Sequence, residues 1–246
     1  MRRARGLPWV LLAAALLSAV FALLGAWQVQ RLGWKKGLIA RTEARVGAAP
    51  VDPPGPRAWP AVQAAPLDFE YRRLRLQGEF LHGDEALVQA STVLGAGFWV
   101  LTPLRLADGS TVLVNRGFVP PERRDPARRE AAPPTGITTV IGLLRISEPH
   151  GGFLRENDPA ADRWHSRDVA AIAAARGLPA DRVAPYFVDA EATPSGSTAP
   201  QWPAGGLTVL RFSDNHLVYA LTWFALAAMV AAGGWYAWRS TRRPPD

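Results

Sequence analysis

The four histidines are the residues best suited to hold a metal ion, because the imidazole nitrogen is the commonest protein ligand for transition metals. His82 and His150 each lie beside a glycine, which predicts surface loops, and His165 follows a tryptophan just before a predicted helix. His216 differs from these three, since it lies at the start of a long apolar segment near the C-terminus. His216 is therefore the strongest candidate ligand in the sequence.

Helical spacing gives His216 a set of neighbours that suits a flat ligand. Successive steps of four, three and four residues place Ala220, Trp223 and Ala227 on its face of a helix. The two alanines would leave a groove for a macrocycle such as haem, with Tyr219 and Trp223 at its border. The alternative is an aromatic belt, in which these side chains lie at the headgroup layer and bind nothing. Spacing alone leaves both interpretations open and favours the belt.

Basic residues follow the first apolar segment, at what should be the same membrane depth as His216. Arg31 and Lys35 are the two that matter here. Either side chain could pair with a carboxylate such as a haem propionate. Either could equally extend to the headgroup layer and bind a lipid phosphate. Both are candidate cofactor-binding residues on this basis.

Other polar groups resemble sites only in composition. Residues 147–150 read Ser-Glu-Pro-His, but residues adjacent in the chain do not build a catalytic triad. Glu156, Asp158 and Asp162 surround an Asp-Pro pair, which is more typical of a plain turn than of a hard-metal site. The chain has no cysteine, and no phosphate-loop, dinucleotide-binding, zinc-protease or nucleophile-elbow motif occurs. We therefore expect no enzyme activity.

Two uncharged apolar segments, residues 7–27 and 215–238, must position these candidates. Each reaches the roughly 20 residues that a helix needs to cross a bilayer. A cleaved signal peptide is the alternative for the first, but its apolar run is long and lacks a small-x-small cleavage site. We expect a transmembrane helix at both positions, and so a multi-pass protein with a lipid bilayer as one of its partners.

The net charge of +7 at pH 7 lies mostly in the two tails, residues 1–6 and 239–246. The tail cations are Arg2, Arg3, Arg5, Arg239, Arg242 and Arg243. The rest of the chain is nearly balanced, which argues against nucleic acid as a partner. The C-terminal arginines predict that both termini are cytoplasmic and that residues 28–214 face outward. The lack of an Arg/Ser-rich presequence predicts a bacterial inner (plasma) membrane.

Residues 28–214 are typical of a β-rich domain with one or two helices. Apolar alternation predicts strands at 71–80, 85–90, 98–104, 111–119, 138–146, 186–190 and 207–212. Helices are expected at 34–46 and 167–176, loops at 120–134 and 193–206, and an extended linker at the proline-dense residues 50–66. The predicted fold class is a membrane protein of α+β type, in which two transmembrane helices bracket an antiparallel β-rich extracytoplasmic domain.

Three motifs in a fixed order resemble the surfeit-locus (Shy-type) family of cytochrome c oxidase biogenesis factors. The first is Leu-Gly-Ala-Trp-Gln at 24–28, followed by Arg31 and by Trp-Lys at 34–35. The second is Val-Asn-Arg-Gly-Phe-Val-Pro at 114–120, where Phe118 stands at a position that is commonly tryptophan in the family. The third is Asn-His-Leu-Val-Tyr-Ala-Leu-Thr-Trp-Phe at 215–224. Each motif is weak alone, and the ordered set is specific.

The resemblance implies an assembly factor for a haem-copper (cytochrome c) oxidase. Such a factor would bind haem a, with His216 as the ligand of its iron, and assist insertion into the catalytic subunit. That subunit is the expected partner, with haem a synthase as a second. The alternative is a membrane scaffold that stabilises an oxidase subunit and never binds haem. Arg116, in the second motif, is expected either to tie loops together or to contact a partner.

Overall fold

The computed structural model describes residues 7–129, 132–152, 155–192, 201–208 and 215–241. It divides into two units, one made of Met1–Thr42 with Leu210–Asp246 and the other of Glu43–Val209. The charged tails from which the topology was predicted lie largely outside the described residues. Each unit is considered by itself.

The first unit is built on two long helices, α1 (Leu7–Val46) and α5 (His216–Thr241). Both are long and apolar enough to cross a membrane, and only 6% of the most apolar stretch of each is buried in the structure. In length and hydropathy both helices are consistent with membrane-spanning helices. The predicted helices at 7–27 and 34–46 are parts of the single helix α1.

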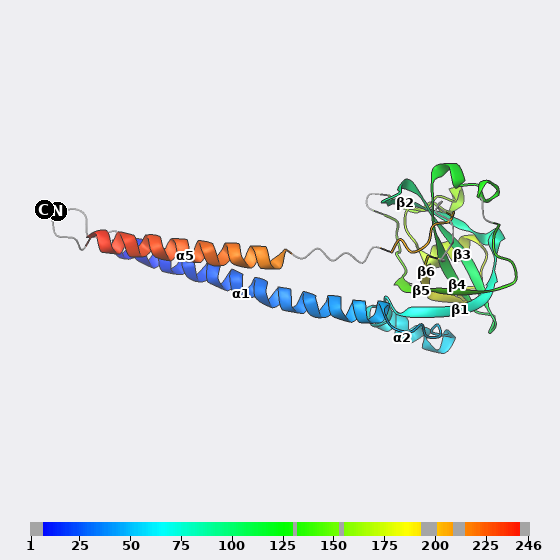
Figure 1. Cartoon of the computed structure of the whole chain (residues 1–246), viewed down its shortest axis with the longest axis horizontal. Coiled ribbons are helices and arrows are strands. Elements are labelled where there is room, and N and C mark those ends of the chain that lie inside the picture. Colours follow the sequence, from blue (N-terminus) through cyan, green and yellow to red (C-terminus); the bar gives the residue numbers. More distant parts are fainter. Residues whose placement is uncertain (1–6, 130–131, 153–154, 193–200, 209–214, 242–246) are drawn as a thin grey trace. The chain divides into compact units, whose positions relative to one another are not determined.

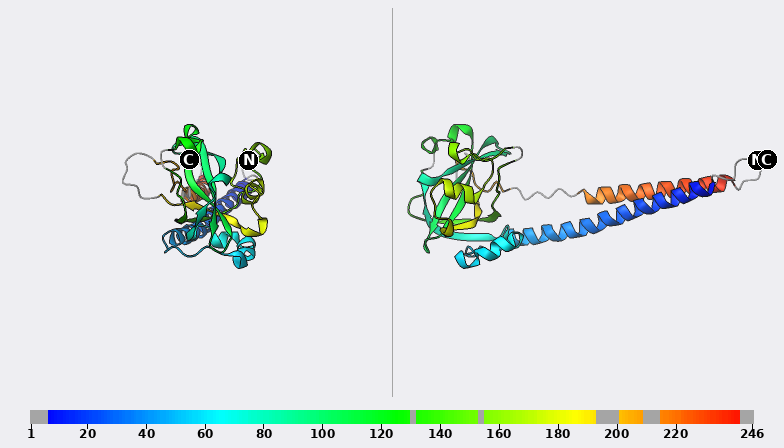
Figure 2. Two further views of the ribbon diagram at one scale, coloured as in Figure 1. Left: turned by 90° about the vertical axis from the view of Figure 1, so that its right-hand side faces the viewer. Right: turned by 180° about the vertical axis from the view of Figure 1, so that it is seen from behind.

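The two helices lie side by side and run antiparallel (Figures 1 and 2). Small residues bring their backbones close, since the Ser18 hydroxyl donates to the Ala227 carbonyl oxygen at 2.9 Å. A Cβ atom added at Gly25 would come within 2.6 Å of the Phe224 ring. Such close approach through small residues is the usual mode of helix association in membranes, where the hydrophobic effect does not drive helices together.

The second unit contains one six-stranded sheet (Figure 1). Its strands are β1 (Arg73–Phe80), β2 (Ala86–Thr92), β3 (Gly95–Leu106), β4 (Thr111–Val119), β5 (Ile137–Ile146) and β6 (Val183–Ala190). The order is β1-β5-β6-β4-β3-β2, and β1 also pairs with β3, so the sheet closes on itself like a barrel. Six of the seven predicted strands are confirmed. In the seventh, residues 207 and 208 are not in a strand, and residues 209–212 lie outside the described residues.

The prediction of a wholly antiparallel sheet is wrong at one pair, because β4 and β6 run parallel. Parallel neighbours need a long crossover connection, and here β5 and α4 (Val169–Ala175) lie between them in the chain. Hairpin signals in the sequence report only neighbouring antiparallel strands, so they could not reveal this pair.

The proline-dense stretch is not the extended linker that its composition predicted. It contains α2 (Trp59–Ala64), α3 (Pro66–Phe69) and a 3₁₀ turn at Pro56–Ala58. Proline lies in the first turn of each of these elements, where its missing N–H is not needed. Val62 of α2 is buried in the barrel core, which fixes the segment. The remaining 3₁₀ turns are His82–Asp84, Pro121–Arg123, Pro126–Arg128, Pro159–Ala161 and Ala180–Arg182.

Two apolar clusters form the core of the domain. The first fills the barrel under α2 and includes Leu74 and Leu76, which follow the alternation predicted for β1. The second lies under α4 and centres on Trp164, Ile172 and Phe187. The predicted helix at 167–176 is confirmed by α4, whose N-terminus is capped by the Asp168 carboxylate.

Candidate functional site

His216 and Gln28 meet at the start of α5. The ring Nδ1 of His216 lies 2.7 Å from Oε1 of Gln28, which belongs to the first motif of the sequence. An amide oxygen only accepts hydrogen bonds, so in this pairing Nδ1 carries the proton. The lone pair of the neutral imidazole is then on Nε2, the nitrogen on the other side of the ring. A partner on one ring nitrogen is the usual arrangement of metal-binding histidines, because it fixes both tautomer and ring orientation.

The groove expected beside His216 is occupied by α1. Ala220 is only 2% exposed and Ala227 only 8%, because both pack in the seam between the helices. Trp223 stacks on Phe21 of α1, with ring centroids 5.6 Å apart. Tyr219 instead points away from the seam and is 54% exposed. The four side chains therefore do not line one cavity between the helices.

Arg31 and Lys35 lie on α1 beyond Gln28, on the same face as it by three-residue and seven-residue spacing. The helical rise puts them roughly 4.5 and 10.5 Å further along the axis than Gln28. The Arg31 guanidinium lies 4.8 Å from the ring centroid of Trp34. The structure thus gathers His216, Gln28 and Arg31 within a short length of the helix pair.

These residues provide the iron ligand of a haem site but not an enclosed groove for the macrocycle. An oriented imidazole with a lone pair on Nε2 suits axial ligation of iron. The enclosed groove is lacking, since a macrocycle at Ala220 would have to displace α1. A haem bound through His216 would therefore lie against the outer surface of the helix pair.

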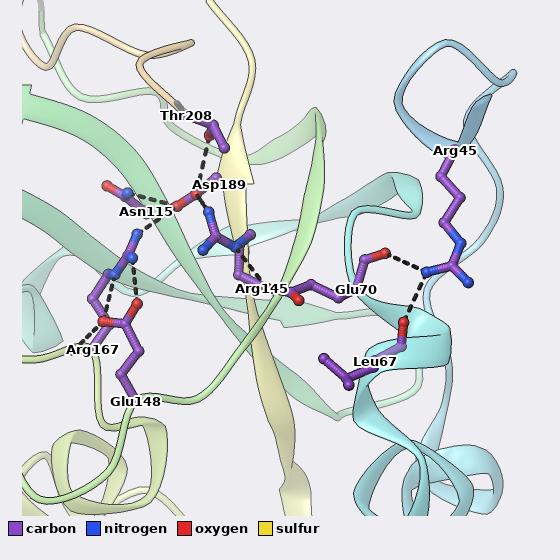
Figure 3. Close-up of polar contacts among 9 residues, drawn as sticks. All are labelled: Arg45, Leu67, Glu70, Asn115, Arg145, Glu148, Arg167, Asp189 and Thr208. Carbon is purple, nitrogen blue, oxygen red and sulfur yellow. Dashed lines mark hydrogen bonds and ion pairs between the residues drawn. The ribbon is translucent and has the colours of Figure 1, made fainter. Parts of the chain in front are cut away.

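A second polar assembly, which the sequence did not reveal, lies inside the β domain around Asp189 of β6 (Figure 3). Its carboxylate is 5% exposed. Oδ1 accepts from Asn115 at 2.8 Å and from Arg167 at 3.3 Å. Oδ2 accepts from Arg145 at 3.2 Å and from Thr208 at 3.1 Å. One signal was present in the sequence, because Asp189 is a charged residue within an apolar strand.

The two arginines of this network have further partners. Arg167 forms a two-pronged pair with Glu148, in which Nε lies 3.0 Å from Oε2. Burial by itself would raise the pKa of Glu148, but hydrogen bonds from Arg167 and its positive charge outweigh burial and hold that pKa below its usual range. Arg145 lies between Asp189 and Glu70, and its Nε is 3.5 Å from the Glu70 carboxylate (Figure 3).

The network connects the two chain segments that lead out of the domain. Arg45, near the end of α1, donates to the carbonyl oxygens of Leu67 at 2.8 Å and of Glu70 at 3.1 Å. At the other end Thr208 binds Asp189, and Thr208 is the last described residue before the chain resumes at residue 215. Figure 3 shows the path from Arg45 through Glu70, Arg145 and Asp189 to Thr208. Arg45 binds only carbonyl oxygens, whereas Arg145 and Arg167 are paired with the carboxylates of Glu70, Glu148 and Asp189, so the network ties these parts of the β domain together.

The second motif has a structural explanation for its glycine and asparagine. Gly117 has φ +130°, and a Cβ atom there would lie 2.2 Å from the Ala204 carbonyl oxygen. The two backbone segments must lie this close together, because the backbone of Phe118 exchanges two hydrogen bonds of 2.9 Å with the backbone of Ala204. The Asn115 amide oxygen accepts from the Gly117 N–H at 3.1 Å. Glycine is the residue that adopts this backbone conformation without strain.

The other polar groups considered from the sequence have structural contacts. Ser147 Oγ accepts from the Val169 N–H at 3.0 Å, and Glu148 pairs with Arg167, so neither faces His150 as a triad would require. Asp158 caps the turn at Pro159–Ala161, and Asp162 accepts from Arg176 at 2.7 Å. Within the described ranges, no group of three His, Cys, Asp or Glu residues could hold a metal ion.

The loop predicted at 120–134 is held more firmly than a solvated loop. Arg129 has only 4% of its side chain exposed and forms two hydrogen bonds with Glu85, at 2.7 and 2.9 Å. Arg116 also approaches Glu85, the residue before β2, at 3.8 Å, which leaves open whether it ties loops together or contacts a partner.

Comparison with known proteins gives a match over most of the chain. The family model described as the SURF1 family matches residues 15–228. The chain is 36% identical to Surfeit locus protein 1 of Homo sapiens, over 94% of this chain and 76% of that protein. The corresponding protein of Mus musculus is 35% identical over 97% and 77% of the two chains. A SURF1-like protein of Monosiga brevicollis is 35% identical over 94% and 87%.

Proposed function

This chain belongs to the SURF1 family, and from that membership we propose that it is an assembly factor for a haem-copper (cytochrome c) oxidase. The resemblance recognised in the three ordered motifs is thereby confirmed. Two long apolar helices at the ends of a central β domain are consistent with a membrane-bound role in assembly. Such a factor would act on an oxidase subunit and would not turn over a substrate.

We further propose that the chain binds haem a through His216 and passes it to the catalytic subunit. The observation that carries this step is the 2.7 Å contact between His216 and Gln28, which directs Nε2 away from Gln28. Haem, when bound, supplies the iron that this nitrogen would ligate. Tyr219 is exposed on the same first turns of α5, and Arg31 and Lys35 supply positive charge for the propionates.

A ligand site on the outside of the helix pair would suit transfer. A haem held by one imidazole on the outside of a helix pair can leave without the helices separating. A fully enclosed site would bind more tightly and would need a large conformational change for release. The acceptor would be the oxidase catalytic subunit, and haem a synthase is the expected donor.

The proposed topology combines the apolar lengths of α1 and α5 with the C-terminal arginines. Both helices would cross one bilayer, the β domain would lie on the outer side, and both termini would be cytoplasmic. The relatives named above are eukaryotic, and their names carry no location. The bacterial inner membrane therefore stays a prediction.

A scaffold that never binds haem is the second candidate function. The burial of Ala220 and Ala227 against α1 favours it, because the groove expected for a macrocycle is filled by protein. A scaffold would use the β domain or the exposed faces of the helices to hold an oxidase subunit. It would bind that subunit equally well with or without His216.

The absorption spectrum of the detergent-purified full chain, from cells that make haem a, tests the proposal. We expect a Soret band that is lost in His216→Ala and kept in the matched control His150→Asn, since His150 is exposed in a loop and asparagine tolerates its φ of 71°. An unpigmented parent that still co-purifies with the catalytic subunit would support the scaffold. A Soret band unchanged in His216→Ala would place the haem elsewhere.

A further inference from the structure

A buried cluster of three charges lies outside the region assigned to haem and outside the Asp189 network. It consists of Glu85, Arg116 and Arg129, whose side chains are 9%, 14% and 4% exposed. Among the described residues, Glu85 is the only carboxylate in ion-pair contact with either guanidinium. The cluster therefore has one positive charge in excess.

The excess positive charge is that of Arg116, because Glu85 binds Arg129 more closely. Glu85 gives both carboxylate oxygens to Arg129, at 2.7 and 2.9 Å, and Arg129 also donates to the carbonyl oxygens of Arg123 and Arg124. The Arg116 guanidinium reaches Glu85 only at 3.8 Å, which is too long for a hydrogen bond. It lies 5.3 Å from the ring centroid of Phe80, and within the part of the chain that the structure describes it forms no hydrogen bond.

The surroundings of Arg116 disfavour its positive charge. Burial lowers the pKa of this guanidinium, Glu85 offsets part of that effect, and Arg129 lowers the pKa further. Arginine nevertheless stays protonated in proteins, so the charge persists without a full partner. An anion beside Arg116 would satisfy donors that no protein acceptor among the described residues uses.

A pocket of about 410 Å³ opens directly onto this side chain. That volume is within the range of small-molecule sites, about 300–1,000 Å³. Its walls are of mixed character and include Arg116, Phe80, Thr138, Ile141, Gln201 and Trp202. Glu191 also lines the pocket, but Arg73 binds both of its oxygens, at 2.6 and 2.8 Å. Its negative charge is thus already paired.

We infer that this pocket binds a small organic carboxylate, with the carboxylate on Arg116 and an apolar or aromatic body between Phe80 and Trp202. The planar guanidinium can bind both oxygens of a carboxylate. The aromatic walls favour an anion that carries an apolar body over an inorganic tetrahedral anion. Flat apolar groups are favoured against aromatic side chains by burial and by ring contacts. This site is independent of His216 and of haem.

Calorimetric titration of the full chain in detergent with benzoate, and with benzamide as its neutral isostere, tests the inference. We expect benzoate to bind at least tenfold more tightly than benzamide. The Arg116→Gln variant should bind benzoate at least tenfold more weakly, and Arg116→Lys should keep part of the affinity. The control Arg105→Gln removes an exposed arginine that pairs with Glu79 away from the pocket, and it should leave the affinity unchanged.

A second variant keeps the charged cluster intact, in case Arg116→Gln does not fold. Thr138 lines the pocket without contacting Glu85 or Arg129, so Thr138→Trp should fill the space and abolish benzoate binding. Equal binding of benzoate and benzamide, or benzoate binding that survives Thr138→Trp, would overturn the inference. Inorganic phosphate that competes as strongly as benzoate would overturn the assignment to a carboxylate.

Discussion

The imidazole of His216 and the side-chain amide of Gln28 are 188 residues apart in the chain, and Nδ1 and Oε1 lie 2.7 Å apart in the structure. This contact joins the first and third sequence motifs at one end of the α1–α5 seam. It gives Gln28 a role that the sequence alone did not suggest, which is to set the tautomer of the candidate ligand. The same pair provides a direct way to test whether ring orientation matters.

Replacing Gln28 by leucine should weaken haem binding without removing the ligand. Loss of a partner on the other ring nitrogen typically costs about 10–100-fold in metal affinity. Gln28→Glu should keep most of the affinity, because a carboxylate also accepts the proton of Nδ1. Soret titration of the three full-length proteins measures the effect. Equal affinities would show that Gln28 does not orient His216.

Replacing Gly25 by leucine should separate α1 from α5, because a Cβ atom there would lie 2.6 Å from the Phe224 ring. The chain has no cysteine, so Ser18→Cys with Ala227→Cys gives a disulfide that reports on the seam alone. We expect its yield to fall several-fold in Gly25→Leu and to recover when Phe224→Ala is added. Gly33→Leu is the matched control, since nothing lies within 4 Å of its added Cβ atom. A disulfide yield in Gly25→Leu equal to that without this substitution would contradict the close packing of α1 on α5 at Gly25.

Removal of the Asp189 carboxylate should destabilise the protein strongly. Asp189→Ala leaves Arg145 and Arg167 buried with one partner fewer, and breaking a buried charge pair costs about 3–5 kcal/mol. Because Glu70 and Glu148 remain as partners, we expect a loss at the lower end, about 3 kcal/mol, in the free energy of unfolding. Chemical denaturation measures it. The control is Glu79→Gln, because Glu79 pairs with Arg105 at an exposed position. This variant should change the free energy of unfolding by less than about 0.5 kcal/mol.

Glu148 should make the stability of the β domain depend on acid. Its pKa in the folded protein is held below the usual value, chiefly because Arg167 overcomes the opposing effect of burial. A carboxyl with a lowered folded pKa stabilises the protein above its unfolded pKa, about 4.3, and this stabilisation is lost as the pH falls through the folded pKa. Thermal melting between neutral pH and pH 3 should therefore show a shallower decline in Glu148→Gln than in the parent. Glu156→Gln, at an exposed position, should follow the parent curve.

Much of the fold followed from local patterns. The apolar alternation of β1 and the buried run of β4 predicted strands that the structure confirms, because side-chain direction repeats every two residues along a strand. The two long helices were evident from uncharged length alone. Composition misled at residues 50–66, since a count of prolines does not distinguish the first turn of a helix from its interior.

The sequence by itself determined the two long helices, the positions of six strands and the candidacy of His216, since each depends on the order of residues along one element. Only the tertiary structure decided which distant residues meet. The parallel pair β4–β6, the closure of β1 onto β3, the burial of Ala220 against α1 and the network around Asp189 all join segments far apart in the chain. The excess positive charge at Arg116 was also decided by the tertiary structure, because whether a guanidinium has a partner depends on the packing of β2, β4 and residues 121–129. Contacts of this kind depend on chain closure over long separations, which no local pattern encodes.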